Sequence, residues 1–308
     1  MTPYLPRMHA PLSRPAIDRT GLLQGIGAYL IWGLLPLYFI LLRGVGSGEV
    51  VASRILFSLL FLAAILALAQ RGAKFRAAMR DRTVVAMLAL SAALISINWL
   101  VYIWAVQHHQ VVAGSMGYFL NPLVSVLLGV VVLKERLTRL QVVAVAIAAV
   151  GVAVLALSAA DGLWISLTLA LSFGLYGLVR KTVRVEALEG LAIETAILTP
   201  IALAYLGWLA QGPGIALGDD TQLTALLVAS GVITAVPLLL FAASARRLPL
   251  ATVGLLQYIA PTLQFLLAVL VLGESLTAAH ILCFACIWSG IALYVTSTVR
   301  APRRVRPA

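Results

Sequence analysis

The sequence has few charged residues and almost no cysteine. Only 11% of its 308 residues are charged, whereas soluble domains carry about 25%. Two cysteines cannot build a disulfide framework. The nucleotide-binding pattern Gly-x-x-x-x-Gly-Lys-Ser/Thr is missing, as are His-Glu-x-x-His and Gly-x-Ser-x-Gly. We therefore expect a protein that is neither a soluble domain nor an enzyme and that needs no metal or cofactor.

The sequence instead contains many long apolar runs. Hydrophobic residues make up 62% of the chain, and the mean hydropathy is +1.04. A membrane-crossing helix needs roughly 20 apolar residues, so ten of them would use about two-thirds of the chain. The sequence predicts an all-α polytopic membrane protein with ten transmembrane helices. Their apolar runs lie at residues 21–42, 49–69, 83–106, 111–133, 138–157, 162–179, 189–209, 222–244, 250–272 and 278–298.

The basic residues assign the two sides of the membrane. Lys and Arg number 22 against 11 Asp and Glu, an excess that in a soluble protein would raise nucleic-acid binding. Here, 20 of the 22 lie in the tails and in the loops after the second, fourth, sixth and eighth runs, whereas the other loops hold only Arg43. Basic loops stay in the cytoplasm. We therefore expect no nucleic-acid partner and two cytoplasmic tails, residues 1–20 and 299–308.

The two halves of the chain repeat each other. Pro122 is followed thirteen residues later by Glu135, and Pro261 is followed at the same distance by Glu274. Each half contains five apolar runs, and an odd number forces the halves into opposite orientations. Inverted repeats place a binding site where they meet, near the middle of the bilayer. The sequence predicts two inverted five-helix repeats, residues 21–157 and 158–298.

Several short motifs carry a family resemblance. The alanine-rich helices, Asn121-Pro122, and Leu-x-Glu-x-Leu-Thr at 133–138 and 272–277 resemble the EamA family of the drug/metabolite transporter superfamily. More narrowly, a second set resembles its RarD subgroup. This set comprises Tyr29-Leu-Ile-Trp-Gly33, Asn98-Trp99-x-x-x-x-Trp104-Ala105-Val106, Gly117-Tyr118-Phe119-x-Asn121-Pro122, Phe173-x-x-Tyr176-Gly177-Leu178-Val179-Arg180-Lys181 and Ile193-Glu194-Thr195. The resemblance covers all ten runs and implies a multi-pass permease of small molecules in the bacterial inner membrane.

Arg54 and Glu194 are the ionisable residues that lie well inside apolar runs. A charge at the centre of a transmembrane helix costs about 2.5–3.5 kcal/mol on insertion scales, so such residues usually face a cavity or a partner. The two should not pair, because their runs place them about 15 Å apart in depth. Arg54 can either bind substrate or snorkel toward Glu49. Glu194 is the candidate proton-binding or cation-recognising carboxylate, with a structural hydrogen bond as the alternative.

Prolines and polar residues near mid-membrane indicate the substrate site. Pro36, Pro122, Pro237 and Pro261 interrupt apolar runs, and each frees a carbonyl that protein or a wet cavity must satisfy. Aromatic and amide side chains cluster near them, as in cavities for small, partly apolar solutes. The candidate substrate-binding residues are Trp32, Asn98, Trp99, Tyr102, Tyr118, Asn121, Gln257, Tyr258 and Gln264.

Three other features have simpler interpretations. Cys283-x-x-Cys286 has no second pair, so two buried apolar residues are favoured over a redox or metal site. His108-His109 is favoured as a polar hairpin, with a pH-sensing gate as the alternative. Glu135 and Glu274 are expected to order hairpins, next to capping residues Thr138 and Thr277.

These observations favour a secondary transporter that exports small metabolites or drug-like solutes by alternating access. Its partners would be a small-molecule substrate and the lipid bilayer, with possible proton coupling, because no motif for nucleotide hydrolysis is present. The alternative is an integral-membrane sensor or scaffold without transport activity, which would normally carry a cytoplasmic module. The sequence does not indicate the oligomeric state.

Overall fold

In the described part of the chain, helices joined by turns and short irregular segments make up the structure. The computed structural model describes residues 18–42, 44–107, 111–157, 163–212, 214–270 and 278–299. In chain order its helices are α1 (Arg19–Leu41), α2 (Ser47–Leu68), α3 (Gly72–Arg80), α4 (Arg82–Gln107), α5 (Val111–Val131), α6 (Arg139–Leu157), α7 (Leu163–Thr182), α8 (Ala187–Gln211), α9 (Thr221–Arg247), α10 (Leu250–Leu256), α11 (Ile259–Leu270) and α12 (Ala278–Val299).

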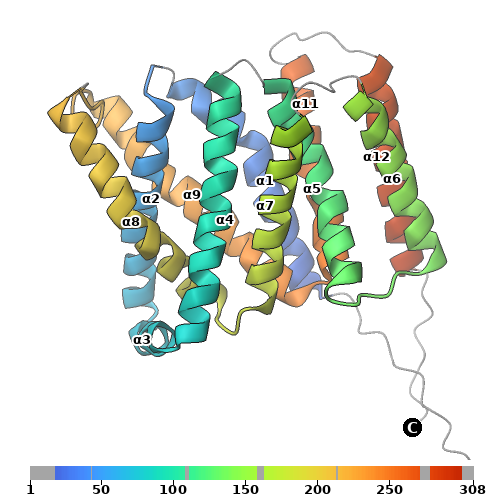
Figure 1. The fold of residues 1–308 in the computed structure, drawn as a ribbon, viewed down its shortest axis with the longest axis horizontal. Coiled ribbons are helices and arrows are strands. Elements are labelled where there is room, and N and C mark those ends of the chain that lie inside the picture. Colours follow the sequence, from blue (N-terminus) through green and yellow to red (C-terminus); the bar gives the residue numbers. More distant parts are fainter. Residues whose placement is uncertain are drawn as a thin grey trace, which may run out of the picture.

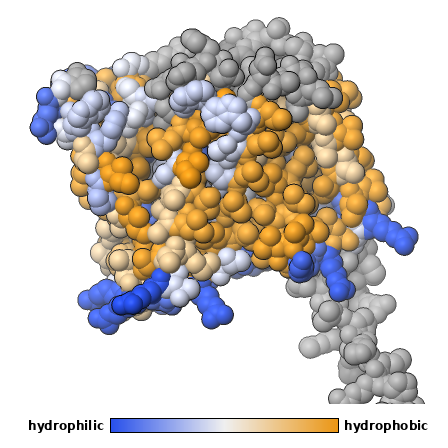
Figure 2. Space-filling view, in the orientation of Figure 1, coloured by the Kyte–Doolittle hydropathy of each residue, from blue (hydrophilic) through white to orange (hydrophobic). Residues whose placement is uncertain are grey.

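The long helices coincide with the apolar runs of the sequence. Among the described residues, seven segments are long and apolar enough to cross a membrane, and shorter apolar segments lie at Met116–Val131, Arg139–Val154 and Ile281–Ser297. The long helices form a bundle and run between its two edges (Figure 1). The surface between these edges is an apolar band, with hydrophilic side chains along its lower edge (Figure 2). A soluble monomer rarely exposes such a band, so the protein is a polytopic helical membrane protein.

Helix α3 lies in a connection that the sequence analysis treats as a loop. It has nine residues, too few to cross a membrane. Lys74, Arg76 and Arg80 are exposed, whereas Phe75 packs against a buried cluster that contains Leu88. A helix with one polar and one apolar side lies along a surface, and α3 lies at the lower edge of the bundle in Figure 1.

The apolar run at residues 250–272 is a broken helix. α10 and α11 are separated by Gln257 and Tyr258, whose amides donate to carbonyls three residues earlier. Pro261 lies in the first turn of α11, where a missing N–H breaks no helical hydrogen bond. Its repeat equivalent Pro122 lies inside the continuous helix α5. The two prolines therefore occupy different backbone environments.

Helices of the first half of the chain pack mainly against helices of the second half. α6 packs on α12, and α5 packs on α7 and α10. α2 packs on α8 and α9, α1 on α9 and α11, and α4 on α7 and α8. The two halves therefore interleave, and their interface runs through the centre of the molecule.

Ion pairs and hydrogen bonds join several helix connections at one end of the bundle. Asp18 before α1 pairs with Arg247 at the end of α9 at 2.9 Å. Arg71 before α3 pairs with Glu186 of the α7–α8 connection at 2.6 Å. The Arg246 guanidinium, also at the end of α9, donates to the Val185 carbonyl of the α7–α8 connection. Glu135 of the α5–α6 connection accepts from the first two amides of α10, at 2.6 and 3.0 Å. We call this the α3 end of the bundle.

The α1–α2 connection lies at the opposite end, together with the α8–α9 connection. The Glu49 carboxylate at the start of α2 accepts from the Leu217 amide at 2.9 Å. The Tyr38 hydroxyl near the end of α1 donates to the Leu226 carbonyl at the start of α9. We call this the α1–α2 end.

Candidate functional site

A cavity of about 700 Å³ occupies the half of the bundle nearest the α1–α2 end. Its lining runs along α1 from Tyr29 to Leu42 and along the first turns of α2 from Ser47 to Arg54. The C-terminal half of α4, part of α5 and the α10–α11 break complete the wall. A cavity of this size can enclose a small organic molecule.

Most of the expected substrate-binding residues line this cavity. The exception is Tyr258, which packs with Cys283 and Ile287 in a separate buried cluster. Arg54 also lines the cavity, whereas Glu194 lies beyond its inner end. The expected residues that line it are Trp32, Asn98, Trp99, Tyr102, Tyr118, Asn121, Gln257 and Gln264.

Aromatic rings form much of the wall and the floor. Tyr102 and Tyr118 have ring centroids 5.6 Å apart. Trp32 lies 5.3 Å from Tyr29 and 5.8 Å from Phe173. Rings at these separations pack favourably and present flat apolar faces to a ligand. Trp32 of α1 and Phe173 of α7 both line the cavity, at its floor.

The amide side chains in the wall also hold helices together. The Asn98 nitrogen donates to the Leu169 carbonyl at 2.9 Å and the Ser172 hydroxyl at 3.0 Å. The Gln257 nitrogen donates to the Ser125 hydroxyl at 3.0 Å, and the Gln264 nitrogen donates to a carbonyl of α1 at 3.2 Å. These bonds occupy amide donors that the sequence analysis assigns to a substrate.

The Asn121 amide also holds two helices together. In the amide orientation that satisfies its neighbours, its nitrogen donates to the Gly117 and Leu169 carbonyls at 3.1 and 3.3 Å. Leu169 belongs to α7, so Asn121 joins α5 to α7. The amides therefore set the shape of the cavity as well as its polarity.

Arg54 lies against three other helices. Its Nε donates to the Thr234 hydroxyl of α9 at 2.8 Å. Its guanidinium carbon is 5.1 Å from the Trp99 ring centroid and 5.5 Å from that of Phe39, within the range of cation–π attraction. The arginine does not snorkel to Glu49, whose carboxylate binds a backbone amide instead.

Below the cavity floor, aromatic rings of α7 and α9 close the bundle. Tyr176 and Phe241 stack with centroids 5.7 Å apart, and Phe173 lies 5.9 Å and 5.3 Å from the two rings. Tyr176 and Phe241 are completely buried. Close-packed rings leave no route for a solute, so the cavity ends at this layer.

Glu194 lies in the closed half and has two partners. The Arg180 guanidinium of α7 contacts its carboxylate at 3.1 Å, and the Ser91 hydroxyl of α4 donates to the same oxygen. Arg180 also donates to the Ala187 carbonyl at 3.1 Å. Arg180 and Glu194 are 1% and 2% exposed. The pair joins α7, α8 and α4 beneath the aromatic layer.

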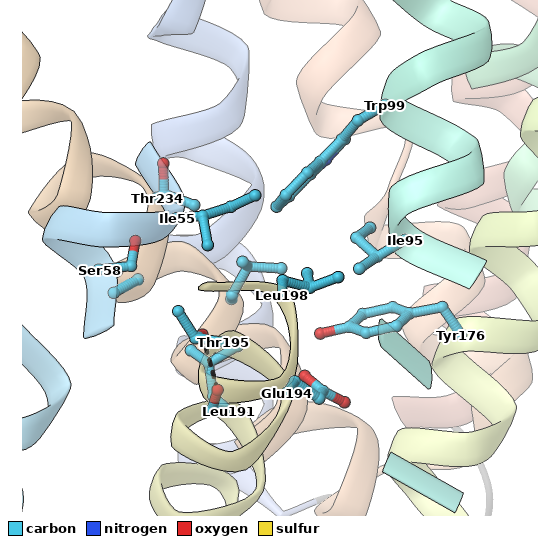
Figure 3. A pocket seen from close by; sticks show the side chains of 12 residues that line it. Ile55, Ser58, Ile95, Trp99, Tyr176, Leu191, Glu194, Thr195, Leu198 and Thr234 are labelled. Carbon is cyan, nitrogen blue, oxygen red and sulfur yellow. Dashed lines mark hydrogen bonds between the residues drawn. The ribbon is translucent and has the colours of Figure 1, made fainter. Parts of the chain in front are cut away.

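A small chamber lies between Glu194 and the cavity. Its volume is about 20 Å³, enough for a single water molecule. Figure 3 shows the Glu194 carboxylate and the Tyr176 hydroxyl on one side of the chamber, with Trp99 on the other. Trp99, together with Ile95 and Leu238, also lines the large cavity. The Glu194 carboxylate is therefore separated from the cavity by one layer of side chains.

The sequence analysis missed Arg180 as a functional residue. It treats Arg180 as a basic residue of the cytoplasmic loop, but the side chain lies inside α7 and is buried. Gly190 makes room for it, because a Cβ at that position would overlap the Arg180 guanidinium. The depth argument contained the signal, since Glu194 and Arg180 both lie near the ends of their runs that the basic residues predict to be cytoplasmic.

The remaining candidates have structural roles where they are described. Thr138 is a capping residue, as expected, and it forms a capping box with Gln141 through bonds of 2.8 and 3.2 Å. Glu135 caps α10 of the other half rather than its own hairpin. Cys283 is buried within α12, and the described residues contain no cluster of metal-ligating side chains. His108, His109, Glu274 and Thr277 lie outside the described residues.

The sequence is similar to several named proteins over nearly its whole length. It is 44% identical to "Protein RarD" of Streptomyces exfoliatus, covering 94% of this chain and 92% of the relative. It is 42% identical to "Protein RarD" of Escherichia coli K12, covering 93% and 97%. It is 42% identical to the "Uncharacterized transporter YojE" of Bacillus subtilis, covering 94% and 97%.

One comparison concerns the fold and another the family. A solved structure described as "Crystal structure of protein" superposes with a TM-score of 0.71, covering 93% of this chain and 99% of the other at 19% identity. At that identity the likeness concerns the fold. Residues 19–157 and 161–296 each match the EamA-like transporter family. The chain therefore belongs to the EamA-like transporter family, and it has RarD proteins among its homologues.

Proposed function

We propose that the protein is a secondary transporter of small metabolites or drug-like solutes in the bacterial inner membrane, working by alternating access as an exporter. The observation that carries the proposal is the cavity of about 700 Å³, which reaches one end of the bundle and stops at a packed aromatic layer. Alternating access requires a binding site that is closed to one side of the membrane. Aromatic walls with few polar groups suit a partly apolar solute.

We propose ten transmembrane helices, with α10 and α11 forming one of them and α3 lying on the membrane surface. Both termini are then cytoplasmic. The grouping of connections at the two ends supports this topology, because α3 and the α5–α6, α7–α8 and α9–α10 connections share one end. Those connections carry the basic residues that mark the cytoplasmic side. The α3 end is then cytoplasmic, and the cavity faces the periplasm.

Two close helix contacts support an inverted repeat. A Cβ built on Gly33 of α1 would lie 2.8 Å from the Leu263 Cβ of α11. A Cβ built on Gly174 of α7 would lie 2.6 Å from a Val124 methyl carbon of α5. Gly33 and Gly174 are 141 positions apart, and Val124 and Leu263 are 139 apart. The same contact therefore occurs twice at the spacing of the repeat, as a pseudo-two-fold axis requires.

Arg54 and Glu194 occupy equivalent places in the proposed repeats. The pattern Glu49-x-x-Ala52-x-Arg54 recurs 140 positions later as Glu189-x-x-Ala192-x-Glu194. Arg54 faces the cavity half, and Glu194 lies in the closed half. An exchange of open and closed halves would bury Arg54 and expose Glu194. The two charges would then face the solute pathway in turn.

We further propose that Glu194 binds the coupling proton. No motif for nucleotide hydrolysis is present, so uphill transport must use an ion gradient. The chamber of about 20 Å³ lets one water approach the carboxylate from the cavity side. Protonation of Glu194 would weaken its pairing with Arg180, because the neutral acid loses the charge attraction. Opening of the α3 end and proton binding would therefore be linked.

Counterflow in proteoliposomes tests the transport proposal. Purified protein is reconstituted with a panel of organic acids, amino acids, aromatic amides and sugars, and uptake of labelled solute against preloaded unlabelled solute is measured. Gln257→Leu should impair counterflow of any solute that the wild type exchanges, because it removes a polar group of the wall. Gln211→Leu, at the end of α8 outside the cavity, is the matched control. Counterflow of no solute would contradict a transporter, and unchanged counterflow in the Gln257 variant would limit that amide to helix bridging.

The same proteoliposomes test proton coupling. Glu194→Gln should abolish accumulation driven by an imposed pH gradient but preserve counterflow, because exchange needs no net protonation cycle. The direction of the driving gradient that supports accumulation also reports export or import. If gradient-driven accumulation survives in the glutamine variant, Glu194 does not bind the coupling proton. Another residue would then carry the coupling, and the role of Glu194 would be structural.

A further inference from the structure

Arg54 presents a positioned cation to the cavity. Its side chain is partly buried and lines the cavity. The bond from Nε to Thr234 at 2.8 Å and the flanking rings of Trp99 and Phe39 fix the plane of the guanidinium. A guanidinium held by its Nε and by rings keeps its Nη groups for other acceptors. α2 therefore carries a rigid donor rather than a flexible surface charge.

This cation has no protein counter-ion in the described part of the chain. Arg54 takes part in none of the described ion pairs, and the described residues that line the cavity include no Asp or Glu. Glu49, on the same helix, accepts from the Leu217 amide, and Glu194 is held by Arg180. An unpaired charge in an apolar membrane interior is costly, so such a residue marks a ligand or an ion pathway.

The other polar groups of the wall do not offer comparable donors. They are neutral, and the Asn98 amide nitrogen uses both of its hydrogens on protein acceptors, whereas those of Gln257 and Gln264 each donate one hydrogen to the protein. The remaining wall is largely aromatic and aliphatic. A ligand would therefore find one strong, charged donor at the α1–α2 side and flat apolar surfaces around Trp32 and Trp99.

We propose that the cavity selects organic monoanions: solutes with one carboxylate on an aromatic or apolar body and without an ammonium group. The planar guanidinium matches a carboxylate in shape and charge, and the apolar body would pack on the tryptophan rings. A free ammonium group would meet the Arg54 charge and no carboxylate among the described lining residues. This inference rests on the proposed transport function, because it assigns the solute class to the same cavity.

The test compares three ligands that share one skeleton. Binding of 3-phenylpropionate, 3-phenylpropanamide and 3-phenylpropylamine to the full-length protein in detergent is measured at pH 7 by isothermal titration. The carboxylate should bind about tenfold or more tightly than the amide, the ratio expected for one charge-assisted hydrogen-bonded pair. The amine should bind more weakly than the amide. Arg54→Gln should remove the preference for the carboxylate without changing the Kd of the amide.

Two further variants complete the experiment. Arg54→Lys keeps the charge but loses the planar donor, so it should retain part of the preference. Arg76→Gln removes an exposed arginine of α3, outside the cavity, and should behave as the wild type. The inference is overturned if the amide or amine binds as tightly as the carboxylate, if Arg54→Gln keeps the preference, or if 3-phenylpropionate does not bind. Counterflow of neutral or cationic solutes would in those cases leave the transport proposal intact, whereas counterflow of no solute would remove it.

Discussion

Arg54 and Glu194 differ in how the fold satisfies their charges. Arg54 has one hydroxyl partner and two aromatic neighbours, and it remains accessible from the cavity. Glu194 is sealed in contact with Arg180 and Ser91. The first arrangement leaves a charge available for a ligand, and the second uses a charge to hold helices together. In the proposed transport cycle each residue would take the other's role once.

The Arg180–Glu194 pair makes a stability prediction. Arg180→Met should lower the free energy of unfolding by about 3–5 kcal/mol, because it leaves a buried carboxylate without its cation. The double variant Arg180→Met, Glu194→Leu should recover most of this loss, since it removes both charges together. Thermal unfolding in detergent, with the exposed Arg184→Met as the matched control, measures the effect. A single variant as stable as the control would contradict a buried, paired Glu194.

Sequence reasoning found some of these residues and not others for a physical reason. Arg54 and Glu194 are conspicuous because each interrupts an apolar run. Arg180 is not conspicuous in the sequence, because Lys181 and Arg184 follow closely and the three residues together are typical of a basic loop. Its shared depth with Glu194 is a weak signal, and packing makes the distinction, since the buried Arg180 guanidinium pairs with a carboxylate of a different helix. Tyr258 was misleading for a related reason: a break in the helix turns its ring into another cluster.

At the scale of helices, the lengths of the apolar runs predict most of the long helices but do not predict where a helix is broken. The runs between charged residues give the long helices, because the cost of burying a charge ends each run. Helix α3 was not expected, since nine residues with three exposed basic side chains gain stability mainly from packing on α4 and α8. The break between α10 and α11 also escaped prediction, because Pro122 and Pro261 occupy equivalent sequence positions but different backbone contexts.

The attachment of α3 makes a prediction about pH. The Arg71 guanidinium, with help from Lys74, holds the pKa of Glu186 below its ordinary value of 4.5. A lowered pKa means that the folded protein favours the charged carboxylate, so the stabilisation is fully present above pH 4.5 and is lost as the pH falls through the lowered pKa. Hydrogen-exchange protection of α3 amides should therefore decrease on acidification from pH 7 to below 4.5.

The Glu186→Gln variant isolates this contribution. It should show reduced α3 protection already at pH 7 and a smaller change on acidification. Asp219→Asn, in the α8–α9 connection at the other end of the bundle, should behave as the wild type. An equal loss of protection in the glutamine variant and the wild type would assign the pH dependence to groups other than Glu186.

At the scale of the whole molecule, the two halves of the chain interleave around one cavity. The repeat could be inferred from the sequence, because the spacing of Pro122 and Glu135 recurs in the second half. The open side could not be inferred, since the proposed inverted repeat would present equivalent helices to both sides. The difference arises from the side chains at equivalent positions of the two repeats. Phe39 and Arg180 are 141 positions apart. Phe39 packs on Arg54, whereas Arg180 pairs with Glu194.

Alternating access is the central claim of this account, and paired cysteine labelling tests it most directly. Val51 lines the cavity, Leu191 lines the chamber in the closed half, and the two are 140 positions apart. In a background with Cys283 and Cys286 replaced by alanine, Val51→Cys should react with a membrane-impermeant thiol reagent from the periplasmic side. Leu191→Cys should resist the reagent from the cytoplasmic side.

Adding Glu194→Gln removes the ion pair that closes the α3 end and should move the equilibrium toward the opposite state. Labelling of Val51→Cys should then decrease while labelling of Leu191→Cys increases, measured in vesicles of defined orientation. General unfolding would raise both rates, so the reciprocal change is specific to alternating access. Unchanged reactivity at both positions, or a rise at both, would contradict a cavity that opens to the two sides in turn.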